Sequence, residues 1–232
     1  MVYDLNRRVI VLFGGCSAQS DNYLNDTWEY DGNNWEKIET AHSPTPRCGF
    51  GMAYDSCRNT TVLFGGYSDL PYDSDTWEYD GSDWTEVDTI ILPPYARSET
   101  AMVFDSNRCL SVLFGGEPEG LVPLDDTWEY DGNNWVQRNF SLTPMGRWTH
   151  AMAFNPIEGK VILYGGYGPQ YPGGDVLGDT WAYDGQTWTE LAHDNSPGPK
   201  DLLAIDFDAI REHIVLFGHH GDVWYLENAN QK

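Results

Sequence analysis

The stretch Val62-Leu63-Phe64-Gly65-Gly66 is an apolar run that ends in a pair of glycines, and variants of it occur five times in the chain. The other copies occupy residues 9–15, 112–116, 161–166 and 214–218, and the last is followed by His219 instead of a second glycine. Their first glycines are 51, 50, 50 and 53 residues apart. A fixed period near 50 residues is typical of a repeat architecture in which each period is one supersecondary unit.

Each period contains four short segments with strand character. The first alternates large and small residues, which indicates a strand packed on both faces. Its small positions recur in register and predict strands crowded around a central axis; they are Gly51, Ala101, Ala151 and Ala204. The second segment is the apolar run itself, which we expect to be buried. The third has the form Asp-Thr-Trp-x-Tyr-Asp and runs into Asp-Gly, a strong hairpin signal. The fourth begins at a tryptophan: Trp35, Trp84, Trp135 or Trp188.

The order of these features closely resembles the kelch repeat: an apolar run into Gly-Gly, a variable gap, then Asp-Thr-Trp-x-Tyr-Asp-Gly-x-x-Trp. The resemblance covers essentially the whole chain and implies an all-β fold, a kelch-type β-propeller similar to the central domain of galactose oxidase. We therefore expect a single propeller over residues 1–232 with five four-stranded blades, the last of which is incomplete and lacks its fourth strand. The blades are expected at about residues 1–40, 47–88, 97–139, 147–192 and 200–228.

The first and last repeats depart from the pattern at the same seam. Only three residues separate Gly218 from Asp222, and no fourth strand is predicted after Leu226. Met1 aligns with Met52, so the chain begins inside a first strand. Either the chain is a trimmed piece of a longer protein or it is a five-bladed ring without an intact strand clasp. An open strand edge at residues 222–227 invites pairing. We expect the C-terminal tail, a neighbouring chain or residues outside this sequence to cover it.

The charge balance limits the classes of partner. The net charge is −23, from 36 acidic and 13 basic residues. Such a chain is a poor ligand for nucleic acid, whose phosphates require Lys and Arg, and for anionic membranes. It has no apolar run of the ~18 residues that a membrane span requires, and its N-terminus does not have the form of a signal peptide. We expect a soluble protein, cytoplasmic or, if the N-terminus is trimmed, secreted.

The four cysteines are Cys16, Cys48, Cys57 and Cys109. They have no CxxC spacing, which argues against a zinc knuckle, and they allow three disulfide connectivities. Cys57 and Cys109 fall in matching turns of successive repeats and could meet. Free thiols are the default expectation.

Functional residues are expected in the loops between second and third strands and between blades, because these are long and variable and should share one face. Tyrosine is suited to peptide or sugar contact there, although the rings could equally pack their own loops. The loop candidates are Tyr23, Tyr67, Tyr72, Glu117, Glu119, Tyr167 and Tyr171. Trp148 and His150 break the repeat at the start of a first strand and are candidates for a stacking platform at the channel mouth or for a packed wedge.

Arg47, Arg97 and Arg147 recur every 50 residues, with Lys200 at the matching position of the fifth repeat. They predict a basic arc near the channel mouth that could receive an anion or a carboxylate. Because the arginine is present in every repeat that includes its position, a structural pair between blades with Asp or Glu is the favoured interpretation.

No catalytic constellation stands out, and no catalytic residue, metal or cofactor is predicted. His219-His220 could help to hold a metal but reads more simply as a loop, and the Tyr–Cys, Tyr and two-His set of the copper-radical oxidases cannot be placed. We expect a non-catalytic scaffold that binds a protein, peptide or glycan on the variable face. The alternatives are a carbohydrate-active enzyme, of the sugar epimerase or oxidase type, with its site at the channel mouth, and a structural piece that self-associates or assembles through its open edge.

Overall fold

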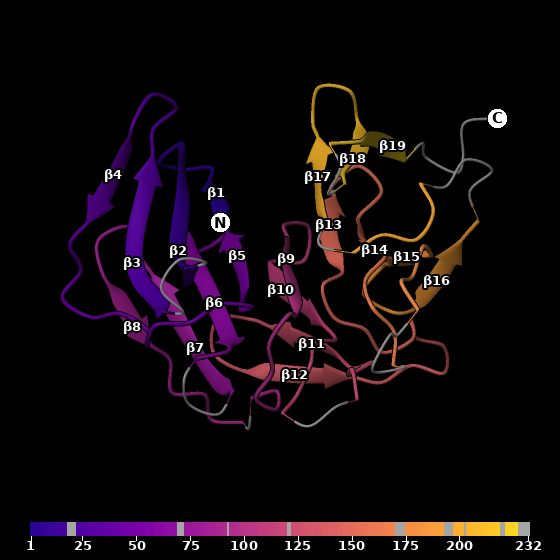
Figure 1. The fold of residues 1–232 in the computed structure, drawn as a ribbon, viewed down its shortest axis with the longest axis horizontal. Coiled ribbons are helices and arrows are strands. Elements are labelled where there is room, and N and C mark those ends of the chain that lie inside the picture. The colour runs from indigo at the N-terminus through magenta and orange to yellow at the C-terminus, as the bar shows by residue number, and fades with distance from the viewer. Residues whose placement is uncertain are drawn as a thin grey trace.

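The computed structural model describes residues 1–17, 22–68, 72–91, 93–119, 122–169, 175–192, 197–201, 203–218 and 221–226. Within these ranges the regular secondary structure is entirely β-strand, arranged in five antiparallel sheets. The sheets follow one another around a centre, as Figure 1 shows, and form a five-bladed β-propeller. The described part of the chain contains no helix long and apolar enough to span a membrane.

The strands follow the predicted four-strand pattern, and each sheet contains consecutive strands in chain order. Blade 1 comprises β1 (Val2–Asp4), β2 (Val9–Ser17), β3 (Asn22–Tyr30) and β4 (Trp35–Ile38). Blade 2 comprises β5 (Gly51–Asp55), β6 (Thr60–Gly66), β7 (Asp73–Tyr79) and β8 (Trp84–Glu86). Blade 3 comprises β9 (Ala101–Asp105), β10 (Leu110–Phe114), β11 (Thr127–Tyr130) and β12 (Trp135–Arg138). Blade 4 comprises β13 (Ala151–Asn155), β14 (Lys160–Tyr164), β15 (Thr180–Tyr183) and β16 (Trp188–Leu191). Blade 5 comprises β17 (Ala204–Asp208), β18 (His213–Phe217) and β19 (Val223–Leu226).

The hairpin between third and fourth strands is built by its Asp-Gly pair. The Asp31 carboxylate accepts hydrogen bonds from the backbone N–H groups of Asn33 and Asn34 at 2.7 and 2.8 Å. Gly32 has a φ of 96°, a conformation that favours glycine. The equivalent aspartates Asp80, Asp131 and Asp184 accept the same hydrogen bonds in the turns of blades 2, 3 and 4, which explains why the motif recurs with so little variation.

The first strand of each blade lies at the centre, and neighbouring first strands pack against one another. Small residues at this register are necessary because the strands converge: a Cβ on Gly51 would lie 3.0 Å from the Cβ of Met102 in the next blade. The predicted crowding around an axis is therefore present. A central cavity of about 580 Å³ remains, lined mainly by apolar side chains of the first strands.

Neighbouring blades pack through the same two faces at each of the four interfaces between successive blades. At the interface between blades 2 and 3, Val62 and Phe64 of β6 pack against Leu113, Trp128 and Trp135. The indole of Trp135 donates a 2.9 Å hydrogen bond to the Thr76 hydroxyl of the preceding blade, and Trp84 and Trp188 repeat this contact with Thr27 and Thr127. Each such tryptophan is almost completely buried, which explains its recurrence at the start of the fourth strand.

At three of these interfaces, a charged cluster at the turn between first and second strands also connects the two blades. Arg58 is held by Asp55 at 2.7 Å and by Glu78 at 2.6 Å, and its guanidinium lies 5.6 Å from the ring centroid of Tyr130 in the next blade. The Tyr130 hydroxyl donates to Glu78 at 2.9 Å. Arg7 and Arg108 make the equivalent contacts in blades 1 and 3.

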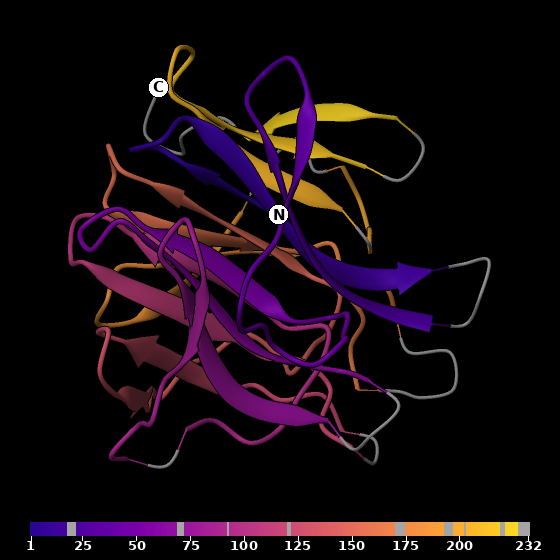
Figure 2. The ribbon, with the colours of Figure 1, turned by 90° about the vertical axis from the view of Figure 1, so that its left-hand side faces the viewer.

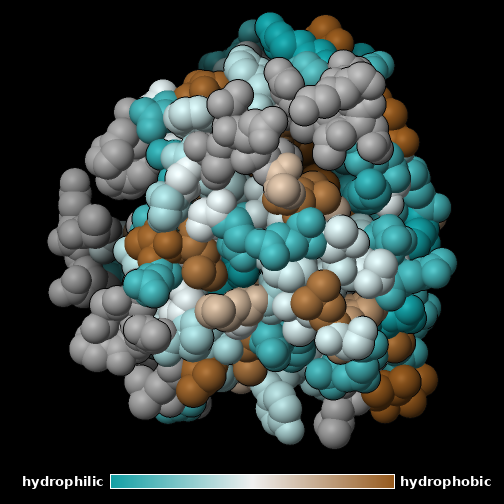
Figure 3. Space-filling model, turned by 90° about the vertical axis from the view of Figure 1, so that its right-hand side faces the viewer, coloured by the Kyte–Doolittle hydropathy of each residue, from teal (hydrophilic) through white to brown (hydrophobic). Residues whose placement is uncertain are grey.

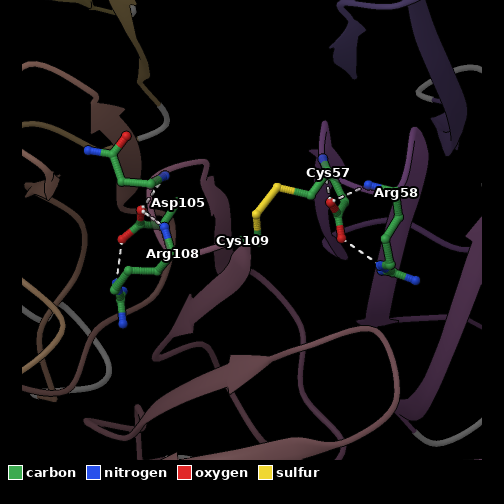
Figure 4. Close-up of a disulfide and its surroundings, with 7 residues drawn as sticks. Cys57, Arg58, Asp105, Arg108 and Cys109 are labelled. Atoms are coloured by element: carbon green, nitrogen blue, oxygen red, sulfur yellow. Dashed lines mark hydrogen bonds and ion pairs between the residues drawn. A yellow bond between two sulfur atoms is a disulfide. The ribbon is translucent and has the colours of Figure 1, made fainter.

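The expectation of free thiols is wrong. Cys16 is bonded to Cys48, and Cys57 is bonded to Cys109. Both bonds join successive blades, and Figure 4 shows Cys57–Cys109 crossing between the turn that carries Arg58 and the turn that carries Arg108. The alternative that Cys57 and Cys109 meet, because they lie in matching turns of successive repeats, is confirmed, and their Cα atoms are 5.9 Å apart. The Cys16–Cys48 pair was not predicted.

The ring is open between blades 5 and 1 (Figure 1). Trp35 on blade 1 is 46% exposed, whereas its counterpart Trp84 is 1% exposed. Phe217 on blade 5 is 53% exposed, whereas its counterpart Phe64 is completely buried. Figure 3 shows the side of the molecule that includes blades 4 and 5, where apolar patches lie among hydrophilic residues. Within the described residues the outer edge of β19 is not paired with another strand; residues 227–232, which were predicted to include part of its cover, lie outside the described residues.

Candidate functional site

The second strands end, and the third strands begin, at the same end of each blade. For blade 1 this end is at the right of Figure 2, where β2 ends and β3 begins. In blades 2, 3 and 4 a short backbone bridge ties the segment before the first strand to the residue after the glycine pair. The bridges are Cys48 with Tyr67, Ser98 with Glu117, and Trp148 with Tyr167. They hold the loop residues in a rim around the channel mouth.

The three arginines of the predicted arc have no exposed surface. Arg97 donates two hydrogen bonds to Asp126, at 2.6 and 2.9 Å, and a third to the carbonyl of Gly115 at 3.0 Å. Arg47 and Arg147 repeat the arrangement with Asp75 and Asp179. Burial alone would raise the pKa of Asp179, but the hydrogen bond and charge of Arg147 outweigh it and lower that pKa.

The ion pair with an aspartate is present, but it lies within a blade and not between blades as predicted. The link between blades is made by the arginine backbone: the carbonyl of Arg97 accepts from the N–H of Gly66 at 2.9 Å. A Cβ on the neighbouring Gly65 would lie 2.8 Å from that same carbonyl oxygen, so this position requires glycine. Lys200 forms a 3.1 Å ion pair with Asp222 in blade 5. The cationic side chains of the arc are therefore already paired with aspartates of the fold, and they do not present free charges at the channel mouth.

Inside the rim the channel mouth forms a cavity of about 300 Å³. It is built from two equivalent positions of successive blades, and its lining residues are Gly49, Phe50, Glu99, Thr100, Thr149, His150 and Leu203. Equivalent positions of successive blades carry different residues here, so the lining of the cavity does not follow the sequence repeat. Departures from a repeat that are not needed for the fold are the best candidates for function.

His150 occupies the position of Phe50 and Thr100 and is 6% exposed. Its ring lies edge-on to Phe114 with 5.6 Å between centroids, and both ring nitrogens are buried. Burial, with a smaller effect of the Arg147 charge, lowers the pKa of His150 to about 3. The imidazole is therefore neutral near pH 7 and packs as part of the interface between blades 3 and 4.

Glu99 was not predicted from the sequence. It stands where blade 2 has Gly49, and it keeps the same left-handed backbone with a φ of 51°. Burial raises the pKa of Glu99, and the charge of Glu117 raises it further. The signal that could have identified Glu99 is its replacement of a glycine in an otherwise regular position. Thr149 is the matching residue of blade 4, also with a φ of 51°.

The predicted tyrosines form part of the rim. Tyr67 is 41% exposed and contacts Tyr23 and Tyr72 edge-on, at centroid distances of 5.4 and 5.2 Å. Tyr23 belongs to blade 1, so this cluster bridges two blades. Across the rim, Trp148 and Tyr167 lie 6.3 Å apart with their rings tilted by 39°. A hydrogen bond to Asp201 raises the pKa of Tyr167.

Other predicted residues contribute less to this geometry. Glu117 is half-buried beside Glu99 and burial raises its pKa, whereas Glu119 is exposed. Tyr171, His219 and His220 lie outside the described residues. In the part of the chain that is described, no group of three or more His, Cys, Asp or Glu side chains is placed to hold a metal ion.

The fold and this mouth define a kelch-type propeller, and comparison with known proteins agrees. The family model described as the KLHDC2/KLHL20/DRC7 Kelch-repeats domain matches residues 1–143 and 56–231. The chain belongs to this family of kelch-repeat domains. It is similar to Adagio-like protein 3 of Oryza sativa subsp. japonica, 33% identical over 98 residues, and to Adagio protein 3 of Arabidopsis thaliana, 32% identical over 98 residues. Each match covers 38% of this chain and 15% of the relative, so the chain aligns with only a small part of these curated proteins.

Proposed function

We propose that this protein is a non-catalytic scaffold that binds a segment of a protein partner across the channel mouth. Kelch propellers commonly mediate protein binding, which supports this class of function. The observation that carries the proposal is the mouth itself: a cavity lined by Glu99 and by apolar side chains, enclosed by a rim in which Tyr67, Trp148 and Tyr167 offer aromatic surface. Such rings contribute large contact area at low conformational cost and are enriched in binding hot spots.

Peptides selected from a random displayed library on the intact protein test this proposal. We expect the selected peptides to lose at least about tenfold in affinity for Tyr67→Ala and for Trp148→Ala, because hot-spot aromatic residues each contribute on the order of 2 kcal/mol. Tyr3→Ala is the matched control, since Tyr3 is 51% exposed and lines the central cavity away from the rim. Peptides that bind all variants equally, or that respond only to Tyr3→Ala, would contradict the proposal. A parallel glycan array distinguishes a sugar ligand.

The open seam favours a second role, self-association. The exposed Trp35 and Phe217 belong to the two faces that pack together at every interface between successive blades. The outer strand β19 adds Val223, Trp224 and Tyr225, which are 49%, 36% and 51% exposed. Multi-angle light scattering tests this role: we expect the apparent mass to rise with concentration and to fall back to the monomer value in Phe217→Glu. A monomer throughout the micromolar range would exclude it.

A further inference from the structure

The cavity at the channel mouth has two chemically different sides. Phe50 and Leu203 provide an apolar wall, and Glu99 provides a carboxylate. Small-molecule sites usually enclose about 300–1,000 Å³. At about 300 Å³ the cavity has the size for one long side chain and not for an extended ligand.

The polar side of the cavity is provided by Glu99. The ring nitrogens of His150 and the hydroxyl of Thr149 are buried and present no surface to the cavity. Glu99 is only partly buried, so its carboxylate is the charged group that a ligand in the cavity can reach.

The charge at this position is negative and uncompensated. Glu99 lies beside Glu117, whose charge raises the pKa of Glu99. The cations closest in the repeat are already engaged: Arg97 and Arg147 are held by Asp126 and Asp179, and Lys200 by Asp222. Glu99 forms no ion pair among the residues that the structure describes. A cation that enters the cavity would therefore meet a carboxylate without a competing partner.

The backbone fixes these side chains in place. The N–H of Glu99 donates to the carbonyl of Gly49 at 2.6 Å, and the N–H of Thr149 donates to the carbonyl of Glu99 at 3.1 Å. These bonds link blades 2, 3 and 4 directly around the mouth. Glu99 and Thr149 both adopt a left-handed backbone, which is unfavourable for a residue with a Cβ. Strain of this kind is common where a site is held in a preformed geometry.

We propose that the cavity receives a lysine or arginine side chain of the bound partner. Its aliphatic stem packs against Phe50 and Leu203, and its cationic head pairs with Glu99. This inference rests on the proposed function, since it identifies the kind of residue that anchors the partner segment.

Titrations of the intact protein with blocked amino acids test the anchor. The probes are N-acetyl-arginine amide, N-acetyl-lysine amide and, as a neutral isostere of the first, N-acetyl-citrulline amide. We expect citrulline to bind at least about tenfold more weakly than arginine, and Glu99→Gln to weaken arginine binding by about tenfold. Glu119→Gln is the matched control, because it removes the same charge from an exposed rim position and should change affinity less than about twofold.

Equal binding of arginine and citrulline, or unchanged arginine binding in Glu99→Gln, would overturn the anchor. Glu99→Gly keeps the test decisive if Glu99→Gln does not fold, since blade 2 has Gly49 at the equivalent position with the same left-handed backbone. Arginine binding should then fall at least several-fold, and unchanged binding would also overturn the anchor. The two proposals can fail separately. Rim-dependent peptides without a required Lys or Arg would overturn the anchor alone. Arginine binding that depends on Glu99, without any rim-dependent peptide, would overturn the proposed function alone.

Discussion

The hydroxyl of Tyr130 donates a 2.9 Å hydrogen bond to the carboxylate of Glu78 in the preceding blade. Tyr79 and Tyr183 make the same bond to Glu29 and Glu129, and an arginine faces each tyrosine ring. The residue before the motif tyrosine is glutamate in blades 1, 2 and 3 and Ala182 in blade 4. The relationship explains why this Glu recurs with the Tyr, because the two residues of one strand serve two different interfaces. The Tyr of a blade reaches back to its predecessor, and the Glu receives the Tyr of its successor.

Tyr130→Phe should therefore destabilise the protein by about 1–2 kcal/mol, because it removes a hydrogen bond to a charged group and leaves Glu78 with one donor fewer. Chemical denaturation measures the free energy of unfolding. Tyr30→Phe is the control in the same repeat position, since the Tyr30 hydroxyl bonds only to the carbonyl of Gly32 in its own exposed turn. Equal effects of the two substitutions would show that the contact between blades contributes nothing.

Trp188→Phe should cost about 2–4 kcal/mol, because the indole is 1% exposed and donates to Thr127 across the interface. Trp35→Phe, at the equivalent position of blade 1, should cost less than about 1 kcal/mol, since Trp35 is 46% exposed. Denaturant unfolding of the two variants checks the contrast. A large loss in Trp35→Phe would instead indicate that the open face of blade 1 is covered in solution.

The disulfides should be detectable and stabilising. Thiol alkylation of the unfolded, unreduced protein should label none of the four cysteines, and peptide mapping should recover Cys16 with Cys48 and Cys57 with Cys109. The double change of Cys57 and Cys109 to Ser should destabilise the protein by about 2–4 kcal/mol, since the bond closes a long loop between two blades. Recovery of free thiols in the oxidised protein would contradict the assigned pairs.

His150 should make the stability depend on pH. Its folded pKa of about 3 lies below the ordinary value of 6.5, so the unfolded state binds the proton first as the pH falls. The stability associated with neutral His150 is complete above about pH 6.5 and is lost progressively toward pH 3, by about 3 kcal/mol at pH 4. His150→Phe should remove this part of the pH dependence while the acid-sensitive Arg147–Asp179 pair remains. Unfolding curves from pH 7 to pH 4 measure the difference, and identical pH profiles of variant and wild type would contradict it.

The blade pattern was predictable because it depends on local chemistry that repeats. The apolar run, the Asp-Gly turn and the tryptophan that starts the fourth strand each determine a strand or a turn within about ten residues. The packing role of the recurrent arginine was predictable in kind, because a residue present in each repeat usually serves the fold. The predicted partner was an acidic residue of the neighbouring blade, whereas Arg147 pairs with Asp179 of its own blade. The choice between these two partners depends on the twist of the sheet.

The sequence by itself determined the kelch propeller, the number of blades and the loops in which the variable residues lie, because each follows from a period of about 50 residues and short-range strand patterns. Only the tertiary structure decided that the cysteines are bonded and that Cys16 pairs with Cys48, that the arginine arc is buried, and that Glu99 of blade 3 meets Thr149 and His150 of blade 4 in one cavity. Positions 50 residues apart become neighbours only when first strands converge on a common axis. The physical reason is geometric. A sequence period predicts that a position recurs in each blade, but residues that depart from the repeat come together only because the blades pack around a common centre.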